Sequence, residues 1–163
     1  MEISLLTPKC TLVPKHFFNP SEAEEALGRV VKLDSNDHVK YTDIPQYDAV
    51  LVYSDFDYIS GGHSEALPEM FYLLSALPEC REYNKILASY REGVLYLAIA
   101  QGKSLMLANA FKAQDFVTAQ YYIFFSMKSL QLNPEVSTIC WRSPVGSEEE
   151  MSLYRYFKAV EQL

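Results

Sequence analysis

Residues 84–163 carry the pattern that most constrains the fold, because three apolar runs follow one another with almost nothing between them. Glu92-Gly93 separates the first run from the second, and Gly102 lies between the second and the third. Glycine accepts the left-handed backbone of a tight hairpin turn at little cost. The pattern therefore predicts a meander of three antiparallel strands. The expected strands are 86–90, 94–100 and 104–111.

A long helix is expected after the meander. Asp115 is a candidate N-cap, because its carboxylate can accept the free N–H groups of a first turn, and the helix can run to about Leu130. Apolar side chains recur along it at spacings of three and four: Phe116, Ala119, Ile123, Met127 and Leu130. The aromatic residues of 121–125 leave little polar surface on the opposite face. We therefore expect the helix to be sandwiched between layers, with its aromatic residues in the core.

The rest of this half predicts one more strand and one more helix. Asn133-Pro134 ends the long helix, 138–141 is expected to be a short strand, and Ser147 with Glu150 forms a capping box. One apolar side of the last helix would lie on the sheet: Met151, Tyr154, Phe157 and Val160. The order βββαβα is that of one lobe of a ribonuclease H-like or actin-like fold. We therefore predict an α/β fold with a mixed sheet flanked by helices.

Residues 1–83 are less regular and predict a partial first lobe of mixed strands and short helices. Asn19-Pro20-Ser21 would start a short acidic helix that ends at Gly28, and a helix from about Glu65 to Leu77 would end before Pro78. Strands are expected at 3–6, 10–13, 29–33, 38–44 and 48–53, with a turn over 34–37. The chain is thus expected to divide into residues 1–83 and 84–163.

Composition excludes several classes of function. The net charge is −7, and the 14 Lys and Arg residues are scattered singly, whereas a nucleic-acid binder or a protein bound to an anionic membrane needs a basic face. No apolar run approaches the roughly 20 residues that span a bilayer, and Glu2 stands where a secretory signal has positive charge. Three cysteines without a pairing pattern indicate reduced thiols. A cytoplasmic protein is expected.

One local string looks catalytic. Residues 62–66 read Gly-His-Ser-Glu-Ala and approximate the Gly-x-Ser-x-Gly turn that exposes a nucleophilic serine. In α/β-hydrolases the histidine base follows that serine, and no histidine follows Ser64 here. The sequence therefore favours a glycine-rich loop that leads into a helix.

Metal-dependent chemistry is also disfavoured. A ribonuclease H-type nuclease needs three or four carboxylates that converge on two metal ions, yet the first strand offers only Glu92 at its end, and Asp115 alone is too little. Neither Cys-x-x-Cys nor His-x-x-x-His occurs. Cys140, beside Trp141, is expected to be a buried strand thiol. No catalytic residue, metal ligand or cofactor is predicted.

Nucleotide binding has three weak candidate residues. An actin-like ATPase would hold phosphates in the turn between its first two strands, where this chain has Arg91-Glu92-Gly93. The glycine fits this role, but the Glu92 carboxylate would repel a phosphate, and no Gly-x-x-x-x-Gly-Lys-Ser/Thr loop occurs. The candidates for a nucleotide cleft are Arg91, Gly93 and Asn109, and nucleotide binding is disfavoured.

Several short strings carry a resemblance to a known family. They are Thr11-Leu12-Val13-Pro14 with Phe17-Phe18, Val50-Leu51-Val52-Tyr53, Ala108-Asn109-Ala110-Phe111, and Asp115 followed by Tyr121-Tyr122. These strings resemble the uncharacterised bacterial family known as domain of unknown function 3822, over most of the chain. The resemblance implies a two-lobed actin-like ATPase fold without an assigned activity.

Two departures from the family pattern matter. Family members have a further strand-rich segment ahead of the Thr-Leu-Val-Pro string, and Trp141-Arg142-Ser143-Pro144 stands where a glycine is expected. An incomplete first lobe would expose an apolar patch that favours a homodimer or a protein partner. We therefore predict a non-catalytic interaction or scaffold protein with a degenerate actin-like fold. The alternative is an ATP-binding protein of the same superfamily.

Overall fold

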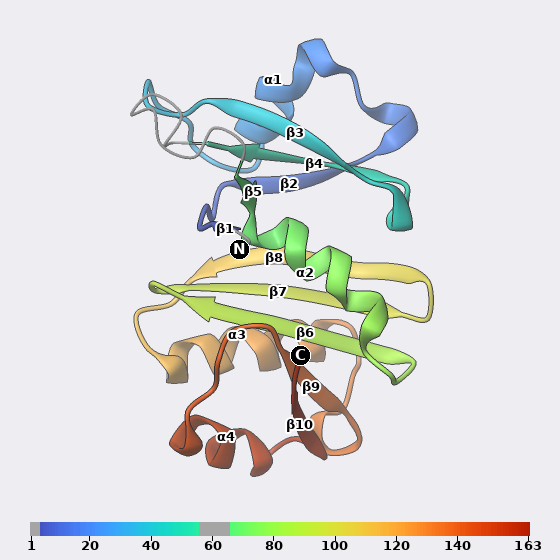
Figure 1. Cartoon of the computed structure of the whole chain (residues 1–163), viewed down its shortest axis with the longest axis vertical. Helices are drawn as coiled ribbons and strands as arrows, with labels where there is room; N and C mark the ends of the chain where they lie inside the picture. The colour runs from blue at the N-terminus through green and yellow to red at the C-terminus, as the bar shows by residue number, and fades with distance from the viewer. Residues whose placement is uncertain (1–3, 56–65) are drawn as a thin grey trace.

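A computed structural model describes residues 4–55 and 66–163 of the chain. Figure 1 shows a stack of layers: a small sheet beneath helix α1, then helix α2, a larger sheet, and helices α3 and α4 at the opposite end. The helices are α1 (Ala23–Gly28), α2 (Glu69–Ala76), α3 (Phe116–Ser129) and α4 (Ser147–Tyr154). Short 3₁₀ turns are found at Lys15–Phe17, Pro20–Glu22, Pro45–Tyr47, Leu77–Glu79 and Pro134–Val136.

The large sheet contains the predicted meander. Its order is β10-β9-β6-β7-β8, with β6–β7 and β7–β8 antiparallel and β9 parallel to both β6 and β10. The turn between β6 and β7 is a two-residue one in which Glu92 and Gly93 have φ values of 48° and 74°. The strands are β6 (Asn84–Arg91), β7 (Val94–Gln101), β8 (Ser104–Lys112), β9 (Thr138–Trp141) and β10 (Ala159–Gln162).

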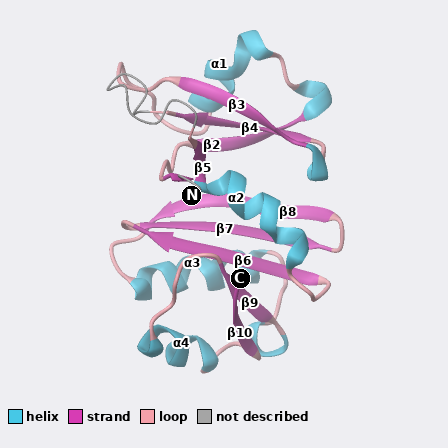
Figure 2. Cartoon of the chain, in the orientation of Figure 1, coloured by secondary structure: helices cyan, strands magenta, loops and turns pink. Residues whose placement is uncertain are grey.

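Two smaller sheets contain the remaining strands. The antiparallel order β2-β4-β3 joins β2 (Cys10–Pro14), β3 (Val39–Ile44) and β4 (Ala49–Ser54). A short parallel pair joins β1 (Ser4–Leu5) to β5 (Leu67–Pro68). The mixed α/β architecture with sheets flanked by helices confirms the predicted fold class (Figure 2).

Helix α2 is the layer that both larger sheets share. Its buried Met70, Leu73 and Leu74 belong to one apolar cluster with Leu51 of the small sheet and Tyr96 of the large one. The opposite face of the large sheet packs on α3, through side chains such as Ile123. A third cluster joins α1 to the outer face of the small sheet.

Helix α3 forms as predicted at its start but is not sandwiched. The Asp115 carboxylate accepts the N–H of Thr118 at 2.8 Å, and Ile123 is fully buried. Val117, Tyr121 and Phe125, however, are 74%, 61% and 58% exposed. The prediction of a helix covered on both sides was wrong, because the face of α3 that carries these three residues is exposed, while α4 contacts another side of the helix through the hydrogen bond between Gln120 and Ser152.

The C-terminal prediction was wrong in two respects. The helix ends at Tyr154, and residues 159–162 form β10 beside β9, so the order is βββαβαβ. Lys158 donates its N–H to Ser137 O at 3.0 Å, which brings the chain back to the sheet and ends any helix. The N-cap is Gly146, whose N–H is accepted by Glu149 at 3.2 Å, one residue before the predicted capping box.

Two expectations for the first half also need correction. Residues 29–33 are not a strand, because Val30 and Val31 give their N–H groups to Leu27 O and so continue the turn after α1. Helix α2 starts at Glu69 rather than near Glu65, since Pro68 is extended and pairs in β5.

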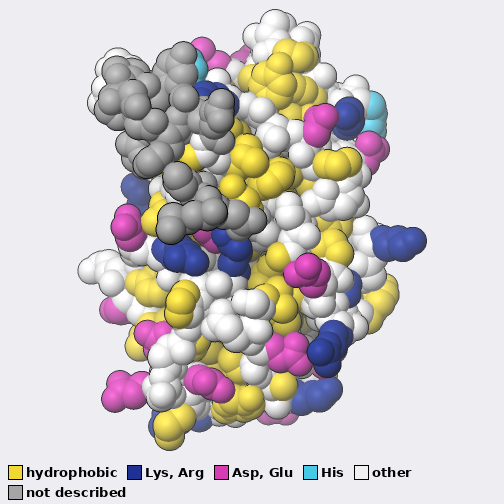
Figure 3. All heavy atoms as spheres, viewed as in Figure 1, with side chains coloured by type: hydrophobic (Ala, Val, Ile, Leu, Met, Phe, Trp, Pro, Cys, Tyr) yellow, Lys and Arg dark blue, Asp and Glu magenta, His cyan; other side chains and the backbone are white. Residues whose placement is uncertain are grey.

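The described part of the chain contains no helix long and apolar enough to cross a membrane. On the face seen in Figure 3, Lys and Arg side chains are dispersed among acidic and apolar ones and form no continuous stripe.

Candidate functional site

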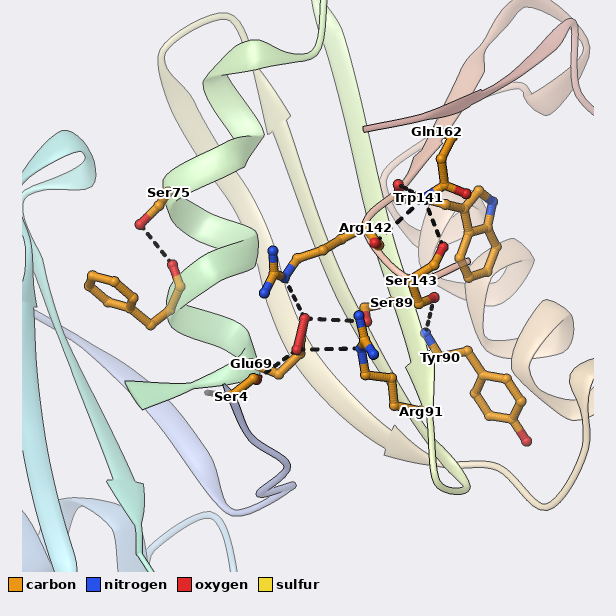
Figure 4. Close-up of polar contacts among 11 residues, drawn as sticks. Ser4, Glu69, Ser75, Ser89, Tyr90, Arg91, Trp141, Arg142, Ser143 and Gln162 are labelled. Atoms are coloured by element: carbon orange, nitrogen blue, oxygen red, sulfur yellow. Dashed lines mark hydrogen bonds and ion pairs between the residues drawn. The ribbon is translucent and has the colours of Figure 1, made fainter. Parts of the chain in front are cut away.

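Glu69, the first residue of α2, has a carboxylate with several polar partners. Pro68 holds an extended backbone with φ −70° and ψ 155°, so the chain turns into the helix at Glu69. The Glu69 side chain is fully buried and points towards the ends of β6 and β9 (Figure 4). Because β6 and β9 are parallel, their carboxyl ends meet at the same edge of the sheet.

Two arginines and two serines surround this carboxylate. Arg142 Nε lies 2.6 Å from Oε1, and Arg91 Nε lies 3.6 Å from Oε2, within ion-pair range but too far for a hydrogen bond. Ser4 Oγ donates to Oε2 at 2.7 Å, and Ser89 Oγ lies 3.4 Å from Oε1. We call these five residues the Glu69 cluster.

The Glu69 cluster connects elements that are far apart in the sequence. Ser4 comes from β1, Ser89 and Arg91 from β6, and Arg142 directly follows β9. The Arg142 guanidinium also lies 4.8 Å above the ring centre of Tyr72 in α2. A buried carboxylate needs such partners because desolvation of an unpaired charge is costly. The arrangement therefore fastens α2 to the large sheet.

The cluster offers little for catalysis. Its members are a paired carboxylate, two guanidiniums and two hydroxyls, and both hydroxyls lie against the carboxylate. Within 4–55 and 66–163, no group of three or more His, Cys, Asp or Glu residues could hold a metal ion. The chemistry that the site supports is the binding and orientation of charged groups.

The three residues considered for a nucleotide cleft do not form one site. Arg91 points to the α2 face of the large sheet, towards Glu69. Asn109 pairs across β7 with Leu97, whose side chain belongs to the core on the α3 face. Gly93 lies in the two-residue turn, where its carbonyl accepts the N–H of Ala113 at 2.8 Å. Arg91 and Asn109 are thus on opposite faces of the sheet.

The other sequence candidates are also separate in space. Asp115 caps α3, and Glu92 is exposed in its turn, so the two are not part of a shared carboxylate site. The Ser64 string lies outside the described residues, apart from Ala66. Sequence reasoning missed Glu69, because a single glutamate at a helix start has no local signal that marks it as buried.

A separate feature, on the surface of the molecule, lies on α3. Val117, Tyr121 and Phe125 follow one another at spacings of four and form an exposed apolar line that we call the α3 stripe. The rings of Tyr121 and Phe125 are stacked, with centres 6.1 Å apart, and Tyr121 also contacts Tyr122. Side chains this large and this exposed at helical spacing give α3 an apolar outer face as well as an apolar inner one.

Comparison with known proteins places these features in a family. The model of a protein of unknown function, DUF3822, matches residues 2–160. The chain belongs to the DUF3822 family. This confirms the resemblance drawn from the short sequence strings. No curated protein matches the DUF3822 chain.

Two solved structures resemble this DUF3822 chain, and one of them does so closely enough to show its fold. A protein from Bacteroides thetaiotaomicron with an actin-like ATPase fold and unknown function matches with a TM-score of 0.83 and 18% identity, over 99% of this chain and 67% of that one. A chain of a PilM-PilN type IV pilus biogenesis complex gives a TM-score of 0.47 and 13% identity, over 94% of this chain and 65% of that one. The match to the Bacteroides thetaiotaomicron protein shows that the DUF3822 chain has the actin-like ATPase fold that we predicted, and the family is one of unknown function.

Proposed function

We propose that this protein is a non-catalytic interaction module, in which an actin-like fold presents the α3 stripe to a protein partner or to a second copy of the chain. The observation that carries the proposal is the exposure of Val117, Tyr121 and Phe125 at 74%, 61% and 58%. Large apolar side chains in a contiguous line favour association, because their burial releases water. Aromatic side chains are also common anchors of protein interfaces.

The turn between β6 and β7 supports this proposal over nucleotide binding. Arg91 and Val94 pair directly across the hairpin, so only two residues form the turn. So short a turn leaves no row of free N–H groups to surround a phosphate. Arg91 is held at the buried Glu69, and Asn109 is on the other face of the sheet.

We further propose that residues 1–83 and 84–163 act as two lobes of a cytoplasmic protein. In support, the β2-β4-β3 sheet lies wholly within the first range and the five-stranded sheet within the second. The three cysteines are free thiols, which agrees with a reducing compartment.

The oligomeric state tests the role of the α3 stripe. We expect light scattering after size-exclusion chromatography at tens of micromolar to give the mass of two chains for the wild type. Tyr121→Ser with Phe125→Ser should give one chain, since the stripe loses both rings. Phe17→Ser is the matched control, because Phe17 is 72% exposed on a different part of the molecule. A monomeric wild type would contradict self-association.

A further inference from the structure

We propose that a second copy of this chain covers the α3 stripe, with the two α3 helices antiparallel about a two-fold axis, an inference that rests on the interaction role proposed for this stripe. The stripe has symmetric spacing, because Val117 lies four residues before Tyr121 and Phe125 lies four residues after it. A two-fold axis at Tyr121 sets the two Tyr121 rings against each other, and sets Val117 of each copy against Phe125 of the other. A two-fold interface needs such a self-complementary patch.

Helix α4 runs beside α3 in the same direction. Gln120 Nε2 of α3 donates to Ser152 Oγ of α4 at 3.0 Å. Four residues further along each segment, the rings of Phe124 and Tyr156 have centres 4.9 Å apart. The N-terminal ends of α3 and α4 therefore lie at one end of this surface, and their C-terminal ends lie at the other.

The two ends of this surface carry opposite charges. The acidic end has Asp115 at the start of α3 and Glu148 in the first turn of α4, and the basic end has Lys128 and Arg155 at the ends of the same helices. Glu148 and Arg155 are two helical turns apart, so they share the side of α4 that carries Ser152 and faces α3. All four charged side chains are exposed, and none forms an ion pair with a residue that the structure describes.

This separation of charge selects the antiparallel arrangement. Asp115 and Lys128 are about 20 Å apart along α3, and the span is the same in both copies. In an antiparallel pair, the acidic end of each copy meets the basic end of the other, so both contacts form at once. A parallel pair would set acid against acid and base against base. Exposed charges add little to affinity one by one, but their complementarity fixes the orientation of an interface.

The test reverses one end at a time and leaves the stripe intact. The basic-end variant is Lys128→Glu with Arg155→Glu. The acidic-end variant is Asp115→Asn with Glu148→Lys, in which asparagine still serves as an N-cap. Each variant alone should dimerise roughly tenfold more weakly than the wild type at low salt, because ends of like charge then meet. Sedimentation equilibrium measures the dimer dissociation constant.

A mixture of the two variants should restore the wild-type affinity, because every contact between ends in the mixed dimer again joins opposite charges. The matched control is Lys15→Glu with Lys32→Glu, which changes the net charge as the basic-end variant does. These exposed lysines follow β2 and α1, at the opposite end of the molecule from α3 (Figure 1). The control should dimerise as the wild type does.

The salt dependence of the wild-type dimer gives a readout without any variant. An interface that joins opposite charges weakens as salt screens them, so the wild-type dissociation constant should rise with sodium chloride. A dissociation constant that does not rise would overturn the pairing of opposite ends, even if a variant failed to fold. Circular dichroism identifies such a variant.

The remaining outcomes separate this inference from the proposed function. If both charge variants dimerise as the wild type does, or the mixture dimerises no better than either, the antiparallel arrangement is overturned and the role of the stripe stands. A monomeric wild type would overturn the second copy as the partner and leave the stripe to another protein. A dimer that survives Tyr121→Ser with Phe125→Ser would contradict the proposed function itself.

Discussion

Glu69 connects three separate segments of the chain through its carboxylate. It is fully buried, and its carboxylate contacts groups from β1, β6 and the residue after β9. The two arginines are partly exposed, with side-chain exposures of 37% for Arg91 and 23% for Arg142, so water screens part of each charge. The stability of the fold should therefore depend more on the buried Glu69 carboxylate than on either arginine.

Glu69→Gln should lower the free energy of unfolding by about 3 kcal/mol, because it leaves two guanidiniums beside a neutral amide. This value is at the low end for breaking a buried pair, since both arginines keep some solvent. Urea unfolding measures it, and the exposed Glu135→Gln is the control. Equal stability of the two variants would show that the Glu69 cluster does not hold the layers together.

Asp37 should govern part of the acid stability of the small sheet. Desolvation alone would raise its pKa, but hydrogen bonds from Lys9 and Ser54 lower the pKa to about 2. Because the folded pKa lies below the unfolded value of about 4, the stabilisation is present above pH 4 and is lost as the pH falls towards 2.

Asp37→Asn should therefore be less stable than the wild type at pH 6, and the gap should narrow between pH 4 and pH 2. Urea unfolding across this range measures the effect, and Asp48→Asn is the control, because Asp48 is exposed. A gap that stays constant with pH would show that the loss comes from packing instead of from the charge of Asp37.

At the scale of elements, the two faces of α3 should respond differently to the same substitution. Ile123→Asp places a charge in the core beneath the large sheet and should abolish soluble expression. Tyr121→Asp, two residues earlier on the exposed face, should still give a soluble, folded protein. A soluble Ile123→Asp protein with unchanged melting would show that α3 is peripheral to the fold.

The elements that could be predicted from sequence are those with local causes. Gly93 and Gly102 mark the two turns of the meander, and the Asp115 side chain accepts the N–H of Thr118 in the first turn of the helix that it caps. Strand β10 could not be predicted in this way, because four residues become a strand only when β9 is beside them. The aromatic residues of α3 would have the same spacing whether water or protein covered them, so their spacing could not predict that Tyr121 and Phe125 are exposed.

The candidate site was predictable only in part, for a related reason. The sequence marks Arg91 as a site residue, but its partner Glu69 is separated from it by the rest of α2, the turn at 77–79 and most of β6. Arg142 had been noted only as part of a departure from the family pattern. A pair of charges that meets through the tertiary fold has no spacing in the sequence that would reveal it.

At the scale of the whole molecule, the actin-like fold does not by itself imply nucleotide binding. We expect ATP, ADP and GTP, with or without Mg²⁺, to leave the melting temperature unchanged. A ligand at a hundredfold excess over its Kd would add about 2.7 kcal/mol, which is several degrees for a chain of this size. Such a shift would contradict the prediction that nucleotides do not bind, and loss of the shift in Arg91→Ala would assign the binding to that residue.

The short β1–β5 ladder has a kinetic consequence. It closes a loop of about sixty residues through only two paired positions, whereas the meander needs only two-residue turns. Contacts so distant in sequence form late in folding, and small ladders are the first to open in hydrogen exchange. When β1 detaches, the Ser4 hydroxyl leaves Glu69, so water should reach that carboxylate while the large sheet is still intact.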